Sequence, residues 1–370
     1  MTHYLFEPVS VAENLQERAL NMSYIDYVTS GVKFIVGLLA IALGTLYVYQ
    51  DNMLYYPNPP GLPKTVDENP QGFNSPQQWN KDGSSNLQSK VGSDPIPFED
   101  TFVTTDDGAK VHLWLMLHDN SANVPTLIYF HGNAGNMGFR LKNAAMMYAA
   151  CGINVLMVDY RGYGSSTGSP SEKGLNLDAE AVLNFAKSHP KLKNSLMVPF
   201  GRSLGGAVAL QLARARPNDI AGVILENTFL SISAMVDTLL PYVAVFKALI
   251  LKIGWNNEKI ISELNQPIMF ISGQADELVP PKHMLKLYEL ATKSKHRDLF
   301  KVPKGRHNDT YERAGKDYYI RMKAFFDRLL GISSSTAGSS SSCVLSEDSD
   351  DGDTDAAIPT MNRNFGVNRQ

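Results

Sequence analysis

The sequence contains little of several features that would assign a protein to a specialised class. Only two of its 370 residues are cysteines, and one of them, Cys343, lies in a polar tail, so a disulfide framework is not expected. The formal net charge of −3 argues against a nucleic-acid partner. The sequence has no metal-ligand cluster, phosphate-binding loop or dinucleotide fingerprint, and no internal repeat. We therefore expect neither a metal nor another cofactor.

Long uncharged apolar runs are also rare, and one is exceptional. Residues 34–49 carry no charge and lie between Lys33 and Asp51. With its flanks, this run approaches the roughly 17 to 25 residues that span a bilayer. A cleaved signal peptide would lie nearer to Met1. We therefore expect residues 32–50 to form an uncleaved transmembrane anchor; the alternative is a buried helix.

Changes in composition divide the rest of the chain. We expect an N-terminal segment 1–31, the anchor 32–50, a polar tether 51–96 along the surface of the domain or the membrane, a domain 97–331, and a disordered Ser-rich acidic tail 332–370. Arg18 and Lys33 precede the anchor and Lys64 follows it. This slight bias favours a cytosolic N-terminus, and hence a single-pass type II membrane protein.

Within residues 97–331, short apolar strands alternate with helices. The strands are expected at 126–130, 154–158, 196–200, 223–225, 268–271 and 299–302, and helices at 141–148, 175–187 and 284–292. This alternation predicts an α/β fold with a mostly parallel central sheet and helices on both faces. An antiparallel pair, 102–103 with 111–115, is expected before it. In such sheets the functional residues gather at the carboxyl ends of the strands.

Ser203 lies in the stretch Gly-Arg-Ser-Leu-Gly, residues 201–205, between an apolar strand and an Ala/Leu-rich helix. A Gly-x-Ser-x-Gly turn in this context is typical of a nucleophile elbow, in which the serine stands exposed on a sharp turn. The pentapeptide alone also fits an ordinary strand-to-helix loop. The residues after the later strands decide between these two interpretations.

An acid and a histidine each follow a later strand. Asp276 comes after the strand at 268–271 and His307 after the strand at 299–302. The chain order Ser, Asp, His is that of α/β hydrolases. We predict that Ser203 is the nucleophile, that His307 accepts its proton, and that Asp276 orients His307. Glu277 is the competing acid.

Two glycine-containing loops follow earlier strands. The first is residues 131–136. We assign its Asn133 backbone N–H to an oxyanion hole, together with the backbone N–H of Leu204, the residue after Ser203. His131 is interpreted as a loop-bracing residue rather than as a base. The second loop is interpreted as structural, with an internal contact between Asp159 and Arg161.

These motifs together resemble the membrane-anchored α/β-hydrolase domain-containing proteins of the bud-emergence type. The motifs are His-Gly-Asn-Ala-Gly-Asn (131–136), Asp-Tyr-Arg-Gly-Tyr-Gly (159–164), Gly-Arg-Ser-Leu-Gly-Gly-Ala-Val-Ala (201–209), Glu-Asn-Thr-Phe-Leu-Ser-Ile (226–232) and His-Asn-Asp-Thr (307–310). The resemblance covers about residues 45 to 331. It implies a serine hydrolase on a type II anchor, with Ser203, Asp276 and His307 as the charge-relay residues. Related branches include protein depalmitoylases and acylglycerol lipases.

An insertion at about 227–264 interrupts the alternation of strands and helices. Its apolar stretch 239–253 could form a second span, but Lys247 and Lys252 argue against one. We interpret the insertion as a short lid over the active site, whose apolar face suits an acyl chain. We therefore expect a membrane-anchored hydrolase of acyl esters or thioesters, acting on an acylated lipid or protein. The alternatives are a serine peptidase and a catalytically silent scaffold.

Overall fold

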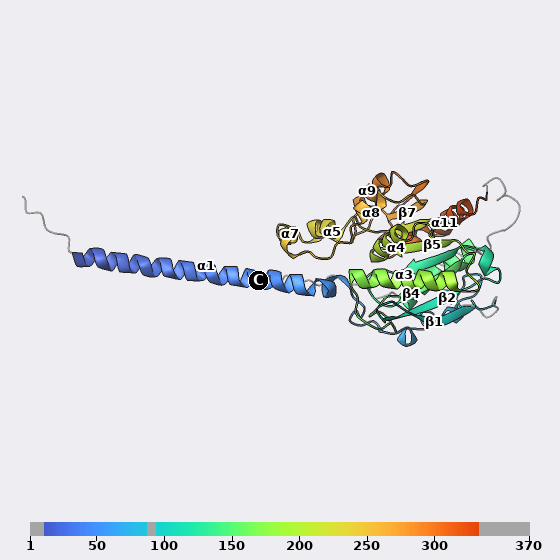
Figure 1. The fold of residues 1–370 in the computed structure, drawn as a ribbon, viewed down its shortest axis with the longest axis horizontal. Helices are drawn as coiled ribbons and strands as arrows, with labels where there is room; N and C mark the ends of the chain where they lie inside the picture. Colours follow the sequence, from blue (N-terminus) through green and yellow to red (C-terminus); the bar gives the residue numbers. More distant parts are fainter. Residues whose placement is uncertain (1–10, 87–93, 333–370) are drawn as a thin grey trace, which may run out of the picture.

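The computed structural model describes residues 11–86 and 94–332. α1 (Val11–Leu54) is one helix of 44 residues that projects away from the domain (Figure 1). Its part from Tyr24 to Leu54 is long and apolar enough, by length and composition, to cross a membrane. The helix begins well before residue 32 because no proline or glycine interrupts residues 11–30. Most of the predicted acidic tail, residues 333–370, lies outside the described residues.

The domain is built on an eight-stranded sheet in the order β1-β2-β4-β3-β5-β6-β7-β8. The strands are β1 (Phe98–Thr104), β2 (Lys110–Met116), β3 (Thr126–Phe130), β4 (Asn154–Asp159), β5 (Met197–Arg202), β6 (Val223–Glu226), β7 (Ile268–Gly273) and β8 (Arg297–Val302). β2 pairs antiparallel with β1 and with β4, and all other neighbours are parallel. The predicted mostly parallel sheet, with its antiparallel pair at one edge, is therefore confirmed.

Helices cover both faces of this sheet. The helices of the domain are α2 (Leu141–Cys151), α3 (Glu172–Ser188), α4 (Leu204–Ala215), α5 (Ile232–Leu239), α6 (Pro241–Ala244), α7 (Lys247–Ile250), α8 (Asn257–Ile261), α9 (Lys282–Leu290), α10 (Thr310–Ala314) and α11 (Lys316–Leu329). α3, α4, α8 and α9 contribute to one hydrophobic cluster, and α2 and α11 contribute to the other.

The strand side chains alternate between these two clusters. In β3, Ile128 and Phe130 join the cluster with α4, whereas Leu127 and Tyr129 join the cluster with α2. All four side chains are fully or almost fully buried. This is the pattern expected of a central parallel strand, which is covered on both faces and is therefore a continuous apolar run in the sequence.

The segment expected to be a polar tether packs closely on the domain. Val66, Trp79 and Ile96 are buried in the cluster with α2, and Trp79 Nε1 donates a hydrogen bond to the carbonyl oxygen of Gly72 at 2.8 Å. The segment runs along the domain. Its apolar side chains, however, belong to the core, so the folded unit begins before residue 97.

The insertion after β6 forms a lid built from α5, α6, α7 and the extended residues 251–256. α5 and α7 lie on the side of the domain from which α1 projects (Figure 1), and α7 contacts α1. No lid helix is long enough to span a bilayer. The position of the lid brings it over the carboxyl ends of the parallel strands.

Candidate active site

Ser203 occupies the sharp turn between β5 and α4. Its φ of 55° and ψ of −117° place a non-glycine residue in a sparsely populated backbone region, which costs free energy and is common at functional sites. The flanking glycines make the turn possible. A Cβ on Gly201 would lie 2.1 Å from the backbone of Gly205, and a Cβ on Gly205 would lie 2.0 Å from the carbonyl oxygen of Phe130. The turn therefore has the form of a nucleophile elbow, with Ser203 partly exposed at its tip.

Asp276 and His307, on the loops after β7 and β8, form a buried pair. His307 Nδ1 donates a hydrogen bond to Asp276 Oδ2 at 2.8 Å. The other oxygen, Asp276 Oδ1, accepts hydrogen bonds from the backbone N–H groups of Leu278 at 2.9 Å and Val279 at 2.8 Å. The carboxylate is thus held in place, and it holds the imidazole with Nε2 as the nitrogen free for proton transfer. Ser203 and His307 line the same cavity.

The competing acid, Glu277, makes a different contact. Its Oε2 accepts a hydrogen bond from the backbone N–H of His307 at 3.4 Å, whereas the His307 ring is bound by Asp276. This geometry favours Asp276 for the orienting role, because only a contact to the ring can set the tautomer of a histidine.

Asn227 is a site residue that reasoning from the sequence misses. It follows β6 with a positive φ of 47° and is buried. Its Nδ2 donates to the carbonyl oxygens of Arg306 and His307, each at 3.2 Å, and to Thr310 Oγ1 at 2.9 Å. Its Oδ1 accepts from the backbone N–H of Gly273 at 2.8 Å. Asn227 therefore ties the His307 loop to the end of β7. The only signal in the sequence is an asparagine placed directly after an apolar strand.

The two assigned oxyanion donors, Asn133 and Leu204, both line the cavity that contains Ser203. Leu204 is the first residue of α4, so its N–H has no acceptor within the helix. Neither N–H donates to another group among the described residues. The carbonyl oxygen of Asn133 accepts hydrogen bonds from Tyr56 N–H at 2.9 Å and from the Tyr163 hydroxyl at 2.8 Å. These contacts fix the peptide groups of the loop and leave two N–H groups available to an anion.

His131 is fully buried, and it is not among the residues that line this cavity. Its Nδ1 donates to the carbonyl oxygen of Gly132 at 2.7 Å, and its own carbonyl accepts from the Tyr160 hydroxyl at 2.8 Å. Its Nε2 lies 3.5 Å from Asp159 Oδ1 but is not aligned for a hydrogen bond. These contacts agree with a loop-bracing residue.

The predicted contact between Asp159 and Arg161 is wrong. Arg161 Nε instead donates to Asp178 Oδ1 at 2.9 Å, and its Nη1 donates to Asp107 Oδ2 at 2.7 Å. Asp159 points the other way and accepts a hydrogen bond from the backbone N–H of Met137 at 2.6 Å. The hydrogen bonds from Arg161 hold the pKa of Asp107 well below its usual range. This loop is structural, as expected, but Arg161 pairs with Asp107 in the turn between β1 and β2 and with Asp178 in α3.

A buried ion pair lies beneath the elbow. Arg202 Nε is 2.9 Å from Glu226 Oε1, and both side chains are almost completely inaccessible. Burial alone would lower the pKa of Arg202, but the adjacent Glu226 carboxylate raises it above the usual value, so Arg202 stays charged. Arg202 Nη1 also donates to the carbonyl oxygen of Asn308 at 3.4 Å. The pair therefore connects the nucleophile strand to the His307 loop.

The cavity at Ser203 has a volume of about 340 Å³, within the usual range for small-molecule sites. α1 contributes Leu46, Gln50, Met53 and Leu54; the lid region contributes Phe229, Ile232, Met235, Val236, Leu239, Leu240, Val243, Lys247, Ile250, Leu251 and Ile253. None of the residues that line it is a carboxylate. Nor do the described residues contain a group of three or more side chains that could hold a metal ion.

Three relatives are similar to this chain in sequence. The chain is 38% identical to the protein bem46 of Schizosaccharomyces pombe over 272 residues, which cover 73% of this chain and 84% of the relative. It is 32% identical to the α/β hydrolase domain-containing protein WAV2 of Arabidopsis thaliana, over 79% of this chain and 92% of that protein. The chain belongs to the α/β-hydrolase family. It is also 37% identical to a membrane protein of Saccharomyces cerevisiae, YNL320W, over 75% of this chain and 89% of that one.

Two further comparisons agree with membership of the α/β hydrolases. A family model described as serine aminopeptidase, S33, matches residues 122–259. Among solved structures, the esterase Pf2001 of Pyrococcus furiosus superposes with a TM-score of 0.53 at 21% identity, over 64% of this chain and 92% of the esterase. At this level of identity the superposition supports the fold alone.

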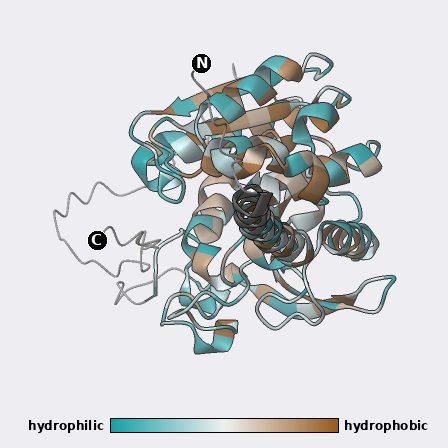
Figure 2. Cartoon of the chain, turned by 90° about the vertical axis from the view of Figure 1, so that its left-hand side faces the viewer, coloured by the Kyte–Doolittle hydropathy of each residue, from teal (hydrophilic) through white to brown (hydrophobic). Residues whose placement is uncertain are grey.

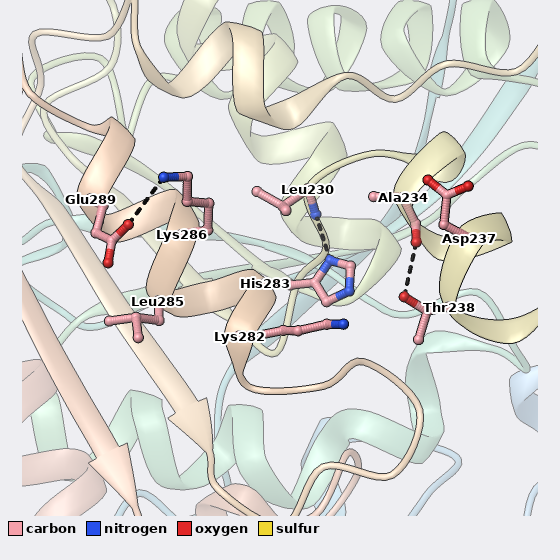
Figure 3. Close-up of a pocket in the computed structure, with 9 residues that line it drawn as sticks. All are labelled: Leu230, Ala234, Asp237, Thr238, Lys282, His283, Leu285, Lys286 and Glu289. Atoms are coloured by element: carbon pink, nitrogen blue, oxygen red, sulfur yellow. Dashed lines mark hydrogen bonds and ion pairs between the residues drawn. The ribbon is translucent and has the colours of Figure 1, made fainter.

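The α/β hydrolase has a second, open hollow of about 480 Å³ on another side of the lid (Figure 3). Lys282 and His283 of α9 face Asp237 and Thr238 of α5 across it, whereas Lys286 pairs with Glu289 of α9 at 3.2 Å. His283 Nδ1 accepts a hydrogen bond from the backbone N–H of Leu230 at 3.3 Å, and burial lowers the pKa of His283. A neutral His283 therefore braces the root of the lid. Ser203, Asp276 and His307 do not line this hollow.

Proposed function

We propose that this α/β hydrolase is a membrane-anchored serine hydrolase that cleaves acyl esters or thioesters. Ser203 Oγ attacks the acyl carbonyl carbon while His307 takes the serine proton. The N–H groups of Asn133 and Leu204 stabilise the resulting oxyanion. The C–O or C–S bond then breaks, and His307 gives its proton to the departing alcohol or thiol. Water attacks the acyl-enzyme with His307 as base, releasing the acid and restoring Ser203.

The observation that carries this proposal is the shared cavity. The strained elbow at Ser203, the ring of His307 and both oxyanion donors border one space. The Asp276 carboxylate orients His307 from outside that space, at 2.8 Å. Nucleophile, base, orienting acid and oxyanion donors are the set that acyl transfer requires.

The walls of the cavity favour an acyl group over a peptide. The family model's description raises an aminopeptidase as a second candidate. An aminopeptidase must bind the positive α-amino group of its substrate, for which a carboxylate is the natural partner. The residues that line this cavity include no carboxylate, and most of them are aliphatic. An acyl chain gains free energy from such walls because its apolar surface leaves water.

α1 and the lid both support an attachment to a bilayer. The apolar part of α1, Tyr24–Leu54, has 31 residues and is roughly 46 Å long at 1.5 Å per residue, more than a hydrocarbon core of about 30 Å requires. Figure 2 views α1 end-on, in front of the domain. The lid exposes Tyr242, Val245 and Leu249, which are 93%, 76% and 76% accessible, and such an apolar patch indicates an interaction surface. We infer a single-pass type II protein whose lid rests on the membrane.

One experiment tests the nucleophile and the anchor together. Membranes from cells expressing the full chain are washed with alkaline carbonate and then labelled with a fluorophosphonate probe. The labelled band should remain in the pellet and should be absent for Ser203→Ala. In sealed microsomes that have not been washed, a membrane-impermeant fluorophosphonate probe should label the protein only after detergent is added, because a type II topology places the domain in the lumen.

Each component of the proposal has its own contrary result. Labelling of Ser203→Ala would assign the nucleophile elsewhere, and an unlabelled wild-type protein would favour a silent scaffold. Release of the labelled band by carbonate would contradict the anchor. Cleavage of aminoacyl amides in preference to acyl esters would favour the peptidase.

A further inference from the structure

We propose that the last turns of α1 form a wall of the acyl-binding cavity, so that the anchor helps to select the acyl chain. This inference rests on the function proposed above. Leu46, Gln50, Met53 and Leu54 all line the cavity that contains Ser203. Their spacing places them along one face of a helix. A helix that served only to tether the domain would have no need to present one face to the active site.

The wall opposite α1 is supplied by the lid. Leu239, Leu240, Val243 and Ile250 line the cavity together with the α1 residues. The one lysine of the lining, Lys247, is paired with Asp237 of α5 at 2.5 Å. An acyl chain between the two walls therefore contacts aliphatic side chains on both sides. The dimensions of this space depend as much on α1 as on the lid.

Gln50 holds α1 and the lid in a fixed register. Its Oε1 accepts hydrogen bonds from the backbone N–H groups of Lys252 at 2.9 Å and Ile253 at 3.0 Å. Its Nε2 donates to the carbonyl oxygen of Ile250 at 3.1 Å. Gln50 is buried, and unpaired polar groups at such a site would be costly. Lys252 Nζ also lies 3.5 Å from Asp51 Oδ2.

The end of α1 is tied to the oxyanion loop as well. Asn133 Nδ2 donates a hydrogen bond to the carbonyl oxygen of Leu54 at 3.0 Å, one of the carbonyl groups that a helix end leaves without a partner. Tyr56 continues this attachment, since its N–H donates to the Asn133 carbonyl oxygen at 2.9 Å. Asn133 is also one of the proposed oxyanion donors, so these bonds fix the α1 wall relative to the carbonyl group of the substrate. The α1 wall therefore contacts the acyl chain at a fixed distance from that carbonyl group.

The test uses the full chain in detergent micelles with p-nitrophenyl laurate and p-nitrophenyl butyrate. Leu46→Trp adds bulk at the wall. The matched control, Val48→Trp, adds the same bulk two residues away at a side chain that is 60% exposed and does not line the cavity. We expect the laurate-to-butyrate ratio of kcat/KM to fall about tenfold in Leu46→Trp, the effect of losing contact with roughly two methylenes. The ratio should not change in Val48→Trp.

A second variant covers the case in which the tryptophan impairs folding. Leu46→Ala removes bulk from the wall and should raise the palmitate-to-laurate ratio several-fold. Wild-type ratios in both Leu46 variants would overturn the inference, as would an equal fall in Leu46→Trp and Val48→Trp. Failure of the proposed function would look different, because the wild-type protein would then cleave none of the esters and resist the fluorophosphonate.

Discussion

Replacing Asn227 tests whether the His307 loop is held by a side chain rather than by its own backbone. Asn227→Gly removes the hydrogen bonds to Arg306, His307, Thr310 and Gly273 and leaves a residue that tolerates a φ of 47°. Asn227→Ala removes the same bonds but keeps a Cβ at this positive φ, without the short polar side chain that lets asparagine adopt it. Comparing the two variants separates the loss of hydrogen bonding from the strain of the backbone.

The magnitude is set by the bonds that are lost. A typical hydrogen bond contributes about 1 kcal/mol, and a buried group left without a partner costs about 1 to 3 kcal/mol. Water molecules can replace some partners, so we expect Asn227→Gly to lower the free energy of unfolding by about 2 to 4 kcal/mol. Asn227→Ala should cost about 1 kcal/mol more, because alanine is disfavoured at a positive φ, whereas glycine is not.

The assay pairs stability with turnover. Urea unfolding of the full chain in detergent, monitored by tryptophan fluorescence, gives the free energy of unfolding, and a short-chain ester gives kcat. Because the His307 carbonyl loses its anchor, kcat should fall at least tenfold, by about 1.4 kcal/mol or more in activation free energy. Asn194→Gly, at an exposed asparagine, is the matched control and should change neither quantity appreciably. A loss of less than about 1 kcal/mol together with a kcat like that of the wild type would refute the reasoning.

Two further predictions concern the acids. Asp276→Asn should lower kcat by several orders of magnitude, by analogy with other triads. Glu277→Gln should lower kcat far less, because Glu277 contacts only the backbone of His307. If esterase assays gave the reverse order, the orienting role would pass to Glu277. Arg161 lowers the pKa of Asp107, so the folded state binds that proton less readily than the unfolded chain. This difference raises the free energy of unfolding at pH values above the pKa of Asp107 in the unfolded chain, about 3.8. The gain is lost as the pH falls below that value. Asp107→Asn should therefore flatten the dependence of stability on pH below about pH 4, and an unchanged acid slope in urea titrations would contradict this.

The sheet could be predicted because buried parallel strands leave a local trace. A strand covered on both faces must be apolar at every position, as in residues 126–130, and this pattern needs no knowledge of its neighbours. The loops that carry Ser203 and Asp276 could be located for the same reason, since each directly follows such a strand, β5 or β7. The loop of His307 follows β8, an edge strand that is only partly buried. Their assigned catalytic roles remain predictions for the labelling and turnover experiments.

The contacts that join distant segments could not be predicted. Proximity in sequence suggests Asp159 as the partner of Arg161, whereas the fold brings Asp178 and Asp107 to its guanidinium. Asn227 lies about 80 residues from His307 in the chain, and its carboxamide is nonetheless the clamp on that loop. A side-chain hydrogen bond has no periodicity, so composition and spacing carry no record of its partner.

The same limit explains why the sequence of residues 32–50 predicts an anchor and nothing more. A uniformly apolar helix has the same composition whether it faces lipid or an apolar cavity, because both environments select the same side chains. Gln50 is a polar residue that closes the apolar run and therefore looks like the end of a membrane span. In the fold, its amide oxygen and nitrogen both bond to the lid, and the nitrogen also donates to the carbonyl oxygen of Tyr47 in α1. In this sequence, therefore, the residue that ends the apolar run is one of those that join α1 to the rest of the fold. Under the proposed function, a helix that both leaves the bilayer and borders Ser203 would hold the active site at a fixed height above the membrane, which an independent tether would not do.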